Sequence, residues 1–168
     1  MGGSGRQHGI DASAHSDGRA ALVCRAGMLL CAFPLGQIVE IMRALPIETL
    51  SGPPAFVLGA TVVRGAAVPV VDVGHLISGP RHAQGTAASW MISLRLNTGG
   101  VVLAVDHILG VERLSPDEAR DLPPLLKETA AEAVSAIGTL DSELLLFLNV
   151  AKCFPFDLMN PTAEGTPS

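Results

Sequence analysis

The chain has 168 residues and a formal net charge of −5, with only 16% charged and 4% aromatic side chains. This length is enough to bury the core of one compact domain, or of two small lobes that share a core. The acidic balance argues against a nucleic-acid partner, which needs a basic face to neutralise phosphates. No apolar run approaches the ~18–20 residues needed to span a bilayer, and the first nineteen residues lack the apolar segment of a signal peptide. We therefore expect a cytoplasmic protein.

Short β-type runs separated by turn residues recur along the chain. They lie at 20–33, 59–73, 90–96, 101–105, 136–140 and 143–148. Before the first run, residues 1–18 are rich in Gly, Ser and Asp, which predicts a disordered tail. The run at 20–33 reads as a hairpin. We expect residues 34–42 to form a connection with a helical turn that carries Glu40.

The first hairpin carries two of the three cysteines, Cys24 and Cys31. If Ala26-Gly27 forms the turn, the two sulfurs are diagonal neighbours whose backbones lie roughly 7–8 Å apart. That spacing is at or beyond disulfide reach. The odd number of cysteines is also typical of reduced thiols in the cytoplasm. We expect both side chains to pack in the core as free thiols.

The middle of the chain contains its clearest turn and linker signals. Arg64-Gly65 interrupts two β-branched runs, and glycine suits a tight turn because it reaches positive φ at little cost. Residues 78–88 are the clearest linker and the expected boundary between two lobes. Beyond it, Ser115 to Glu118 has the pattern of a helix capping box, and we expect residues 125–134 to add a second helix. The tail at 158–168 is predicted to be flexible, which leaves 19–157 as the folded domain.

The run from Gly59 to Asp72 resembles the signature of the CheW-like coupling proteins of bacterial chemotaxis, in which Gly-x-x-Asn-Leu-Arg-Gly-x-x-x-Pro-x-x-Asp occupies this place. Val62-Val63 stand here where that family has Asn-Leu. Four further segments fit the family in order. They are the opening hairpin, Ile38 to Ile41, Val101 to Val111, and Leu144 to Asn149 followed by Lys152. The resemblance covers roughly residues 20 to 154.

This resemblance implies an all-β fold of two packed five-stranded SH3-like barrels, with short helices in the connections. It also implies a non-catalytic adaptor in two-component signal transduction. Such an adaptor couples the cytoplasmic tip of a transmembrane chemoreceptor to the regulatory domain of a CheA-type histidine kinase, and so joins membrane-associated receptor arrays without inserting into the membrane. The partner-binding positions carried over from the family are Ile38, Glu40, Gly59, Arg64, Ile108 and Val111.

Each of these positions also has a purely structural interpretation. Arg64 can hold a structural ion pair with Asp72 or Glu40, because a guanidinium beside so much apolar surface needs a carboxylate. Gly59 suits a close approach of two backbones, and its effect on binding is then indirect. Glu40 can be a solvated charge on a short helix, and Ile38, Ile108 and Val111 can serve as core residues.

Signatures of enzymes and cofactor sites are missing from the sequence. It contains no phosphate-binding loop, dinucleotide fingerprint or nucleophile elbow. Asp72, His75, Asp106 and His107 share no metal-ligand spacing, and adjacent strand residues point to opposite faces. We expect no enzymatic activity, no cofactor and no metal. Two alternatives remain: a scaffold of the same family in a non-chemotactic pathway, and a small β-barrel that binds a metabolite in a closed apolar pocket.

Overall fold

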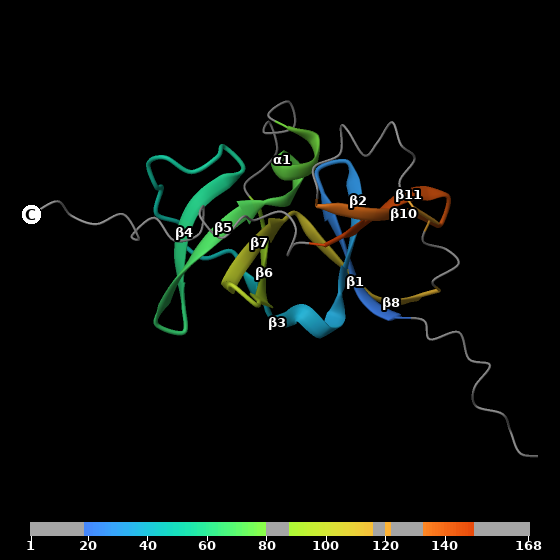
Figure 1. Ribbon diagram of the computed structural model, residues 1–168, viewed down its shortest axis with the longest axis horizontal. Helices are drawn as coiled ribbons and strands as arrows, with labels where there is room; N and C mark the ends of the chain where they lie inside the picture. Colours follow the sequence, from blue (N-terminus) through green and yellow to red (C-terminus); the bar gives the residue numbers. More distant parts are fainter. Residues whose placement is uncertain (1–18, 80–87, 116–119, 122–132, 150–168) are drawn as a thin grey trace, which may run out of the picture.

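The computed structural model describes residues 19–79, 88–115, 120–121 and 133–149. Two β-sheets, mostly antiparallel, make up the described part of the chain and lie side by side in Figure 1. The first has the strand order β8-β1-β2-β11-β10-β9, and the second has the order β3-β6-β7-β5-β4. The strands are β1 (Arg19–Ala26), β2 (Leu29–Pro34), β3 (Ile38–Arg43), β4 (Val57–Val63), β5 (Ala66–Asp72), β6 (Trp90–Leu96), β7 (Gly99–Val105), β8 (His107–Leu114), β9 (Arg120–Asp121), β10 (Val134–Leu140) and β11 (Glu143–Leu148).

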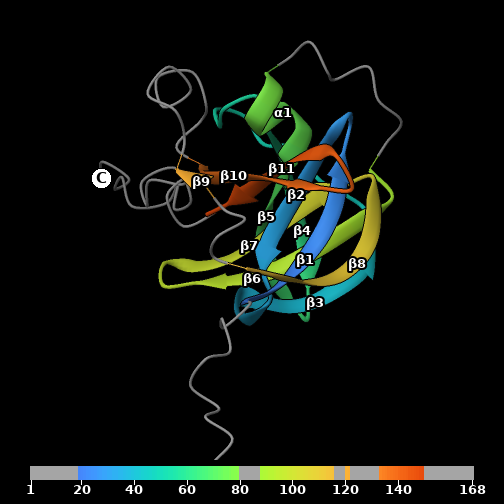
Figure 2. The ribbon, with the colours of Figure 1, turned by 90° about the vertical axis from the view of Figure 1, so that its right-hand side faces the viewer.

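The two expected barrels correspond to these two sheets. The second sheet has the five expected strands, whereas the first gains a sixth through the two-residue β9. All the β-type runs found in the sequence form strands, because each is a short apolar run with turn residues at its ends. Figure 2 shows the first sheet from outside, with β1, β2 and β8 facing the viewer.

The core consists of three apolar clusters, and the alternation of side chains along each strand explains how they divide. Residues of one parity, such as Leu22 on β1 and Leu103 on β7, pack in a central cluster shared by both sheets. Residues of the other parity pack on the far face of each sheet, such as Val23 in the first and Val102 in the second. Val101 to Val105 is therefore buried on both faces. Each lobe has a core of its own, and the central cluster joins the two.

The register of the first hairpin differs from the expected one. The turn falls at Gly27-Met28, with Gly27 at φ 60, so Cys24 lies directly opposite Cys31. The prediction of diagonal cysteines was wrong because Gly27 takes the first turn position, not the second. Both cysteines are free and fully buried, as expected.

The lobe boundary expected at 78–88 was also misplaced. The segment after α1 (Val73–Ser78) leads from β5 to β6, and both strands belong to the second sheet. The chain instead crosses between sheets at η2 (Leu35–Gln37) and again at Asp106, which separates β7 from β8. Pairing between strands far apart in the sequence determines which strands belong to each sheet, so a linker-like composition does not reveal the boundary.

Other expectations about connections had mixed outcomes. The helical turn after the first hairpin is limited to Leu35–Gln37, and Glu40 lies on strand β3. Helix α1 is one of the short connecting helices that the family resemblance implies, but no helix was expected at this position; the Asp72 carboxylate caps it by accepting a hydrogen bond from the His75 backbone N–H at 3.0 Å. The predicted tails and the helices expected from Ser115 to Val134 fall mainly outside the described residues. No described helix has the length and hydropathy needed to cross a membrane.

Candidate partner-binding site

Arg64 and Glu40 form a two-pronged ion pair on the second sheet. The Arg64 Nε donates to Glu40 Oε1 and Nη2 donates to Oε2, both at 3.1 Å. Arg64 lies in the turn between β4 and β5, whereas Glu40 lies on β3, at the opposite edge of the sheet. The pair therefore links the two ends of the five-stranded sheet and closes it toward a barrel. Of the two carboxylates that the sequence offered as partners of Arg64, the structure selects Glu40.

The turn geometry sets the position of Arg64. Arg64 has φ 51 and Gly65 has φ 81, so both residues are left-handed, as in the two-residue turns that match the twist of a hairpin. A non-glycine residue adopts this conformation at some cost in free energy. Its side chain is 76% exposed, while that of Glu40 is 28% exposed. The Arg64 side chain thus stays largely exposed to solvent even while it binds Glu40.

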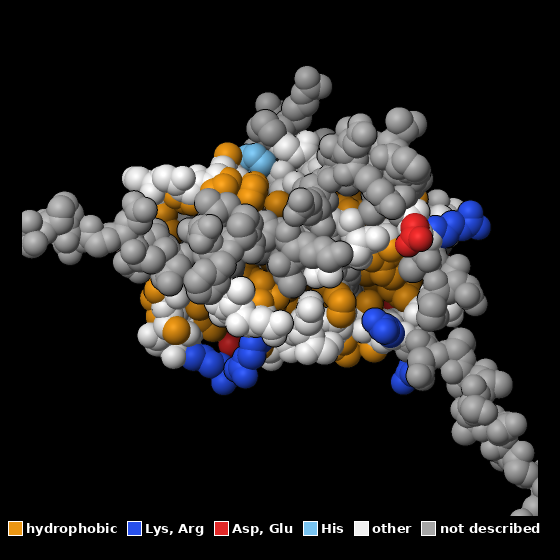
Figure 3. Space-filling model, viewed as in Figure 1, with side chains coloured by type: hydrophobic (Ala, Val, Ile, Leu, Met, Phe, Trp, Pro, Cys, Tyr) orange, Lys and Arg blue, Asp and Glu red, His pale blue; other side chains and the backbone are white. Residues whose placement is uncertain are grey.

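Hydrogen bonding between Glu40 and Arg64 moves their pKa values in opposite directions. The bond from Arg64 lowers the pKa of Glu40, and the bond to Glu40 raises the pKa of Arg64. The stabilisation from Glu40 is therefore present above its unfolded pKa of 4.5 and is lost as the pH falls through the lower folded value. At neutral pH both groups are charged. Figure 3 shows blue and red side chains together at lower left, where Figure 1 places the tips of the β4–β5 hairpin and β3.

Gly59 has the structural role that the sequence suggested. It is buried on β4 with φ 146, and a Cβ there would lie 1.9 Å from the Glu48 carbonyl oxygen. The neighbouring Ala60 exchanges two backbone hydrogen bonds of 2.8 Å with Glu48. Gly59 thus allows the loop before β4 to lie against the strand and supports the site indirectly.

The three apolar candidate residues lie on the outer strands of the two sheets. Ile38 on β3 and Ile108 on β8 are partly buried and pack against the same central cluster. Val111, also on β8, is 53% exposed. Neighbouring apolar side chains on these two strands are exposed as well: Val39, Ile41 and Leu109. The structure thus brings Ile38 and Ile108 to one core and leaves Val111 facing solvent.

Sequence reasoning missed a hollow of about 280 Å³ beside β4. Its lining consists of Leu45, Pro46, Glu48, Ala60, Thr61, Val62 and Ala67. The Thr61 hydroxyl donates to the Pro46 carbonyl at 2.7 Å and so fixes the loop against the strand. Val62 is 65% exposed. The only signal in the sequence that pointed to this hollow was Val62, which stands where the family signature has Asn.

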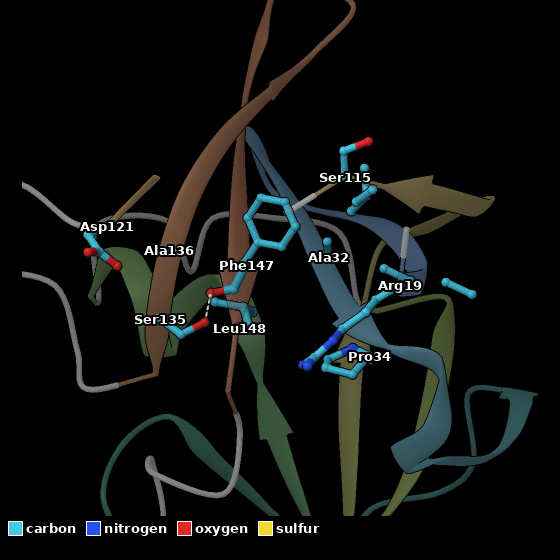
Figure 4. A pocket seen from close by; sticks show the side chains of 12 residues that line it. Arg19, Ala32, Pro34, Ser115, Asp121, Ser135, Ala136, Phe147 and Leu148 are labelled. Carbon is cyan, nitrogen blue, oxygen red and sulfur yellow. Dashed lines mark hydrogen bonds between the residues drawn. The ribbon is translucent and has the colours of Figure 1, made fainter. Parts of the chain in front are cut away.

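A larger hollow of about 380 Å³ lies on the first sheet, where Ala20, Ala21, Ala32 and Ala136 leave space with their short side chains. Figure 4 shows Phe147 and Leu148 on one side and Arg19 reaching in from β1. The Ser135 hydroxyl donates to the Phe147 carbonyl at 3.1 Å. This volume is within the range of small-molecule sites, so the hollow is where the metabolite-binding alternative can be tested.

Both aspartates considered for metal binding have other contacts. Asp72 caps α1, and the Asp106 carboxylate accepts a hydrogen bond from the Gly27 backbone N–H, which ties the β7–β8 crossing to the first hairpin. Within the described ranges, no cluster of three or more His, Cys, Asp or Glu side chains could hold a metal ion.

Comparison with known proteins identifies the family. The model of the CheW-like domain matches residues 20–156, most of the chain. The chain belongs to the CheW-like family. Protein FrzA of Myxococcus xanthus is 30% identical over 134 residues, covering 76% of this chain and 80% of FrzA. The chemotaxis protein CheW of Klebsiella aerogenes is 25% identical over 118 residues, covering 69% of each chain.

The CheW-like fold is also found in a solved structure. The scaffolding protein TtCheW from Thermoanaerobacter tengcongensis superposes with a TM-score of 0.68 and 18% identity, over 78% of this chain and 88% of TtCheW. At this identity the likeness concerns the fold. It confirms the expected all-β CheW-like architecture.

Proposed function

We propose that this chain is a non-catalytic coupling protein that binds a chemoreceptor tip and the regulatory domain of a histidine kinase. In this role it works in the cytoplasm and is recruited to receptor arrays at the membrane. The observation that carries the proposal is the Glu40–Arg64 pair, on a chain of the CheW-like family. Its guanidinium is held in place by a turn and by a carboxylate, yet most of its surface remains open to a partner.

The apolar positions supply the second part of the proposed binding surface. Ile38, Ile108 and Val111 lie on outer strands, where a partner can reach the exposed side chains without unfolding either sheet. Interfaces combine a few apolar anchors with charged groups that set orientation and partner choice. Coupling needs no cofactor, since different affinities for the active and inactive kinase assemblies suffice to shift kinase activity.

The test is binding of a purified receptor tip and a purified kinase regulatory domain to the wild-type chain and to Arg64→Ala. We expect the variant to bind at least one partner about 10- to 100-fold more weakly, which is the effect of losing a charge-assisted hydrogen bond. Arg25→Ala is the matched control, because Arg25 holds a comparable ion pair with Glu143, at 2.9 Å, on the other sheet. Normal binding by Arg64→Ala, or no binding by the wild-type chain, contradicts the proposal.

The metabolite-binding alternative predicts a different result. A ligand that occupies the hollow near Arg19 raises the melting temperature by mass action. The coupling proposal predicts that ATP and common divalent metal ions leave the melting temperature unchanged. A rise of several degrees at micromolar ligand would favour the alternative.

A further inference from the structure

The backbone of β4 is open on its outer side at Val62. β4 is the last strand of its sheet, and Ala60 uses its outward N–H and C=O to bind Glu48. Along an antiparallel ladder, every second residue has the same backbone orientation. The register from Ala60 to Val62 is continuous, so the N–H and C=O of Val62 also point away from β5. Within the described ranges, no backbone group pairs with Val62 on that side.

The sequence of the preceding loop explains why pairing stops there. Glu48 and Ala60 form an antiparallel bridge, so the next outward pair would join Pro46 to Val62. Proline has no N–H to donate, and the Pro46 carbonyl accepts the Thr61 hydroxyl instead. The hollow of about 280 Å³ lies at this point and is lined by both Pro46 and Val62.

The chemistry of the hollow indicates what it can hold. Apart from Thr61, whose hydroxyl already has its acceptor, the lining residues are apolar except for Glu48, which is exposed and brings a negative charge to the hollow. An apolar side chain with a basic neighbour complements this arrangement. An open N–H and C=O beside a side-chain pocket is the pattern used when a partner adds a strand to a sheet edge.

We propose that Val62 and this hollow receive an extended segment of a partner protein. The segment bonds the Val62 backbone, places an apolar side chain in the hollow and sets a Lys or Arg beside Glu48. Arg64 is two residues farther along the chain, so one partner can contact the site and the Glu40–Arg64 pair together. That the segment comes from the receptor or the kinase rests on the proposed function; the site itself rests on the geometry of β4.

The first test uses a defined peptide as the probe. The peptide acetyl-Lys-Val-Leu-Val-Lys-amide is titrated into the ¹⁵N-labelled full chain, and backbone amide shifts are followed by NMR. We expect shifts at Ala60 and Val62, and weaker binding of the counterpart with Glu in place of both Lys residues. No shift at these amides at millimolar peptide, or equal binding of the two peptides, overturns the proposal.

Two variants separate the backbone contact from the hollow. Val62→Pro removes the outward N–H without removing a bond to β5, and should weaken peptide binding about three- to tenfold, the effect of one hydrogen bond. Ala67→Leu fills the hollow from an exposed position and should weaken binding similarly. Val62→Thr keeps the N–H and the β-branched shape, and is the matched control. Unchanged binding by a folded Val62→Pro chain and by Ala67→Leu rules the site out.

The same variants distinguish this inference from the proposed function. If Arg64→Ala weakens partner binding while Val62→Pro and Ala67→Leu do not, coupling stands and the edge site is wrong. If the peptide binds at Val62 but neither receptor tip nor kinase domain binds the wild-type chain, the edge site stands and the coupling proposal is wrong.

Discussion

Cys24 and Cys31 face each other across the first hairpin as a directly opposed pair of free thiols. Neither side chain is exposed, and burial raises the pKa of each thiol to about 12. Directly opposed strand residues have Cβ atoms roughly 4.5–5.5 Å apart. Two neutral thiols therefore fill the central cluster as small apolar groups, and the reactive thiolate is scarce at physiological pH.

We predict that Cys24 and Cys31 resist alkylation in the native protein at pH 8 and react fully once the chain is unfolded. The expected result is an iodoacetamide adduct at both positions only after denaturation, measured by peptide mass spectrometry. The control is the same reaction in denaturant, where both thiols are exposed. Rapid labelling of the native chain, or a Cys24–Cys31 disulfide in protein isolated without reductant, would contradict this prediction.

The raised thiol pKa values also predict a loss of stability in alkaline solution. The folded state keeps both thiols protonated up to a pKa of about 12, whereas the unfolded chain releases these protons near 9.0. Their contribution is therefore complete below pH 9 and is lost as the pH rises from 9 to 12. Urea unfolding at pH 7.5, 9 and 10.5 should show this decline. A Cys24→Ala, Cys31→Ala chain should show a smaller one, and equal slopes would count against the thiols as the cause.

Gly59→Ala should destabilise the fold by about 2 kcal/mol or more, because the new Cβ meets the Glu48 carbonyl and φ is positive. Gly36→Ala is the matched control, since nothing lies within 4 Å of a Cβ at that position. Both are measured as free energies of unfolding in urea. Equal stability of the two variants would mean that the loop before β4 moves aside freely.

Exchanging the charges of the Glu40–Arg64 pair should distinguish a structural role of the ion pair from a role in partner binding. Glu40→Arg with Arg64→Glu restores an ion pair between β3 and the β4–β5 turn, but it reverses the charges that a partner meets. We expect a melting temperature near that of the wild-type chain, since exposed ion pairs contribute little to stability, together with loss of partner binding. Arg64→Asn removes the charge while suiting the left-handed turn, and should also lose binding without unfolding. Normal binding by the exchanged chain would make the pair purely structural.

Ile108→Ala should lower both stability and partner affinity, because its side chain packs on the central cluster from the outer strand β8. For a partly buried Ile we expect about 1–3 kcal/mol of lost stability. Val111→Ala, at an exposed position on the same strand, should weaken binding with little change in unfolding free energy. If both variants bind normally, β8 is not part of the interface.

Most of the strands were predictable from the sequence because their signals are local, whereas β3, β8 and β9 were not among the predicted runs. Short apolar runs end at turn residues such as Arg64-Gly65 and Asp141-Ser142, and all of the predicted runs form strands. The register of the first hairpin was not predictable, since Gly27 can take either position of the two-residue turn. Moving the turn by one residue changes the residue that lies opposite Cys24. Likewise, β2 pairs in parallel with β11, and no local signal announces a partner more than a hundred residues away.

The candidate site was predictable only in part, for the same reason. The sequence singled out Arg64 but left Glu40 and Asp72 as equal partners, because the choice depends on the two sheet edges meeting. Asp72 instead ends a strand and caps α1, a local role that the sequence analysis missed. The open backbone position at Val62 depends on where Pro46 falls opposite β4, which only the three-dimensional register reveals.

The pairing of β2 with β11 also has a consequence for synthesis of the chain. Leu30 to Ala32 on β2 pair with Leu145 to Phe147 on β11. The first hairpin therefore cannot complete its sheet until β11 has left the ribosome. The second sheet, contained in residues 38–105, can pair earlier. During that interval the apolar face of the first hairpin lacks its cover. Such non-local closure is slow, so this hairpin is where we expect chaperones to engage the nascent chain and where truncated chains aggregate.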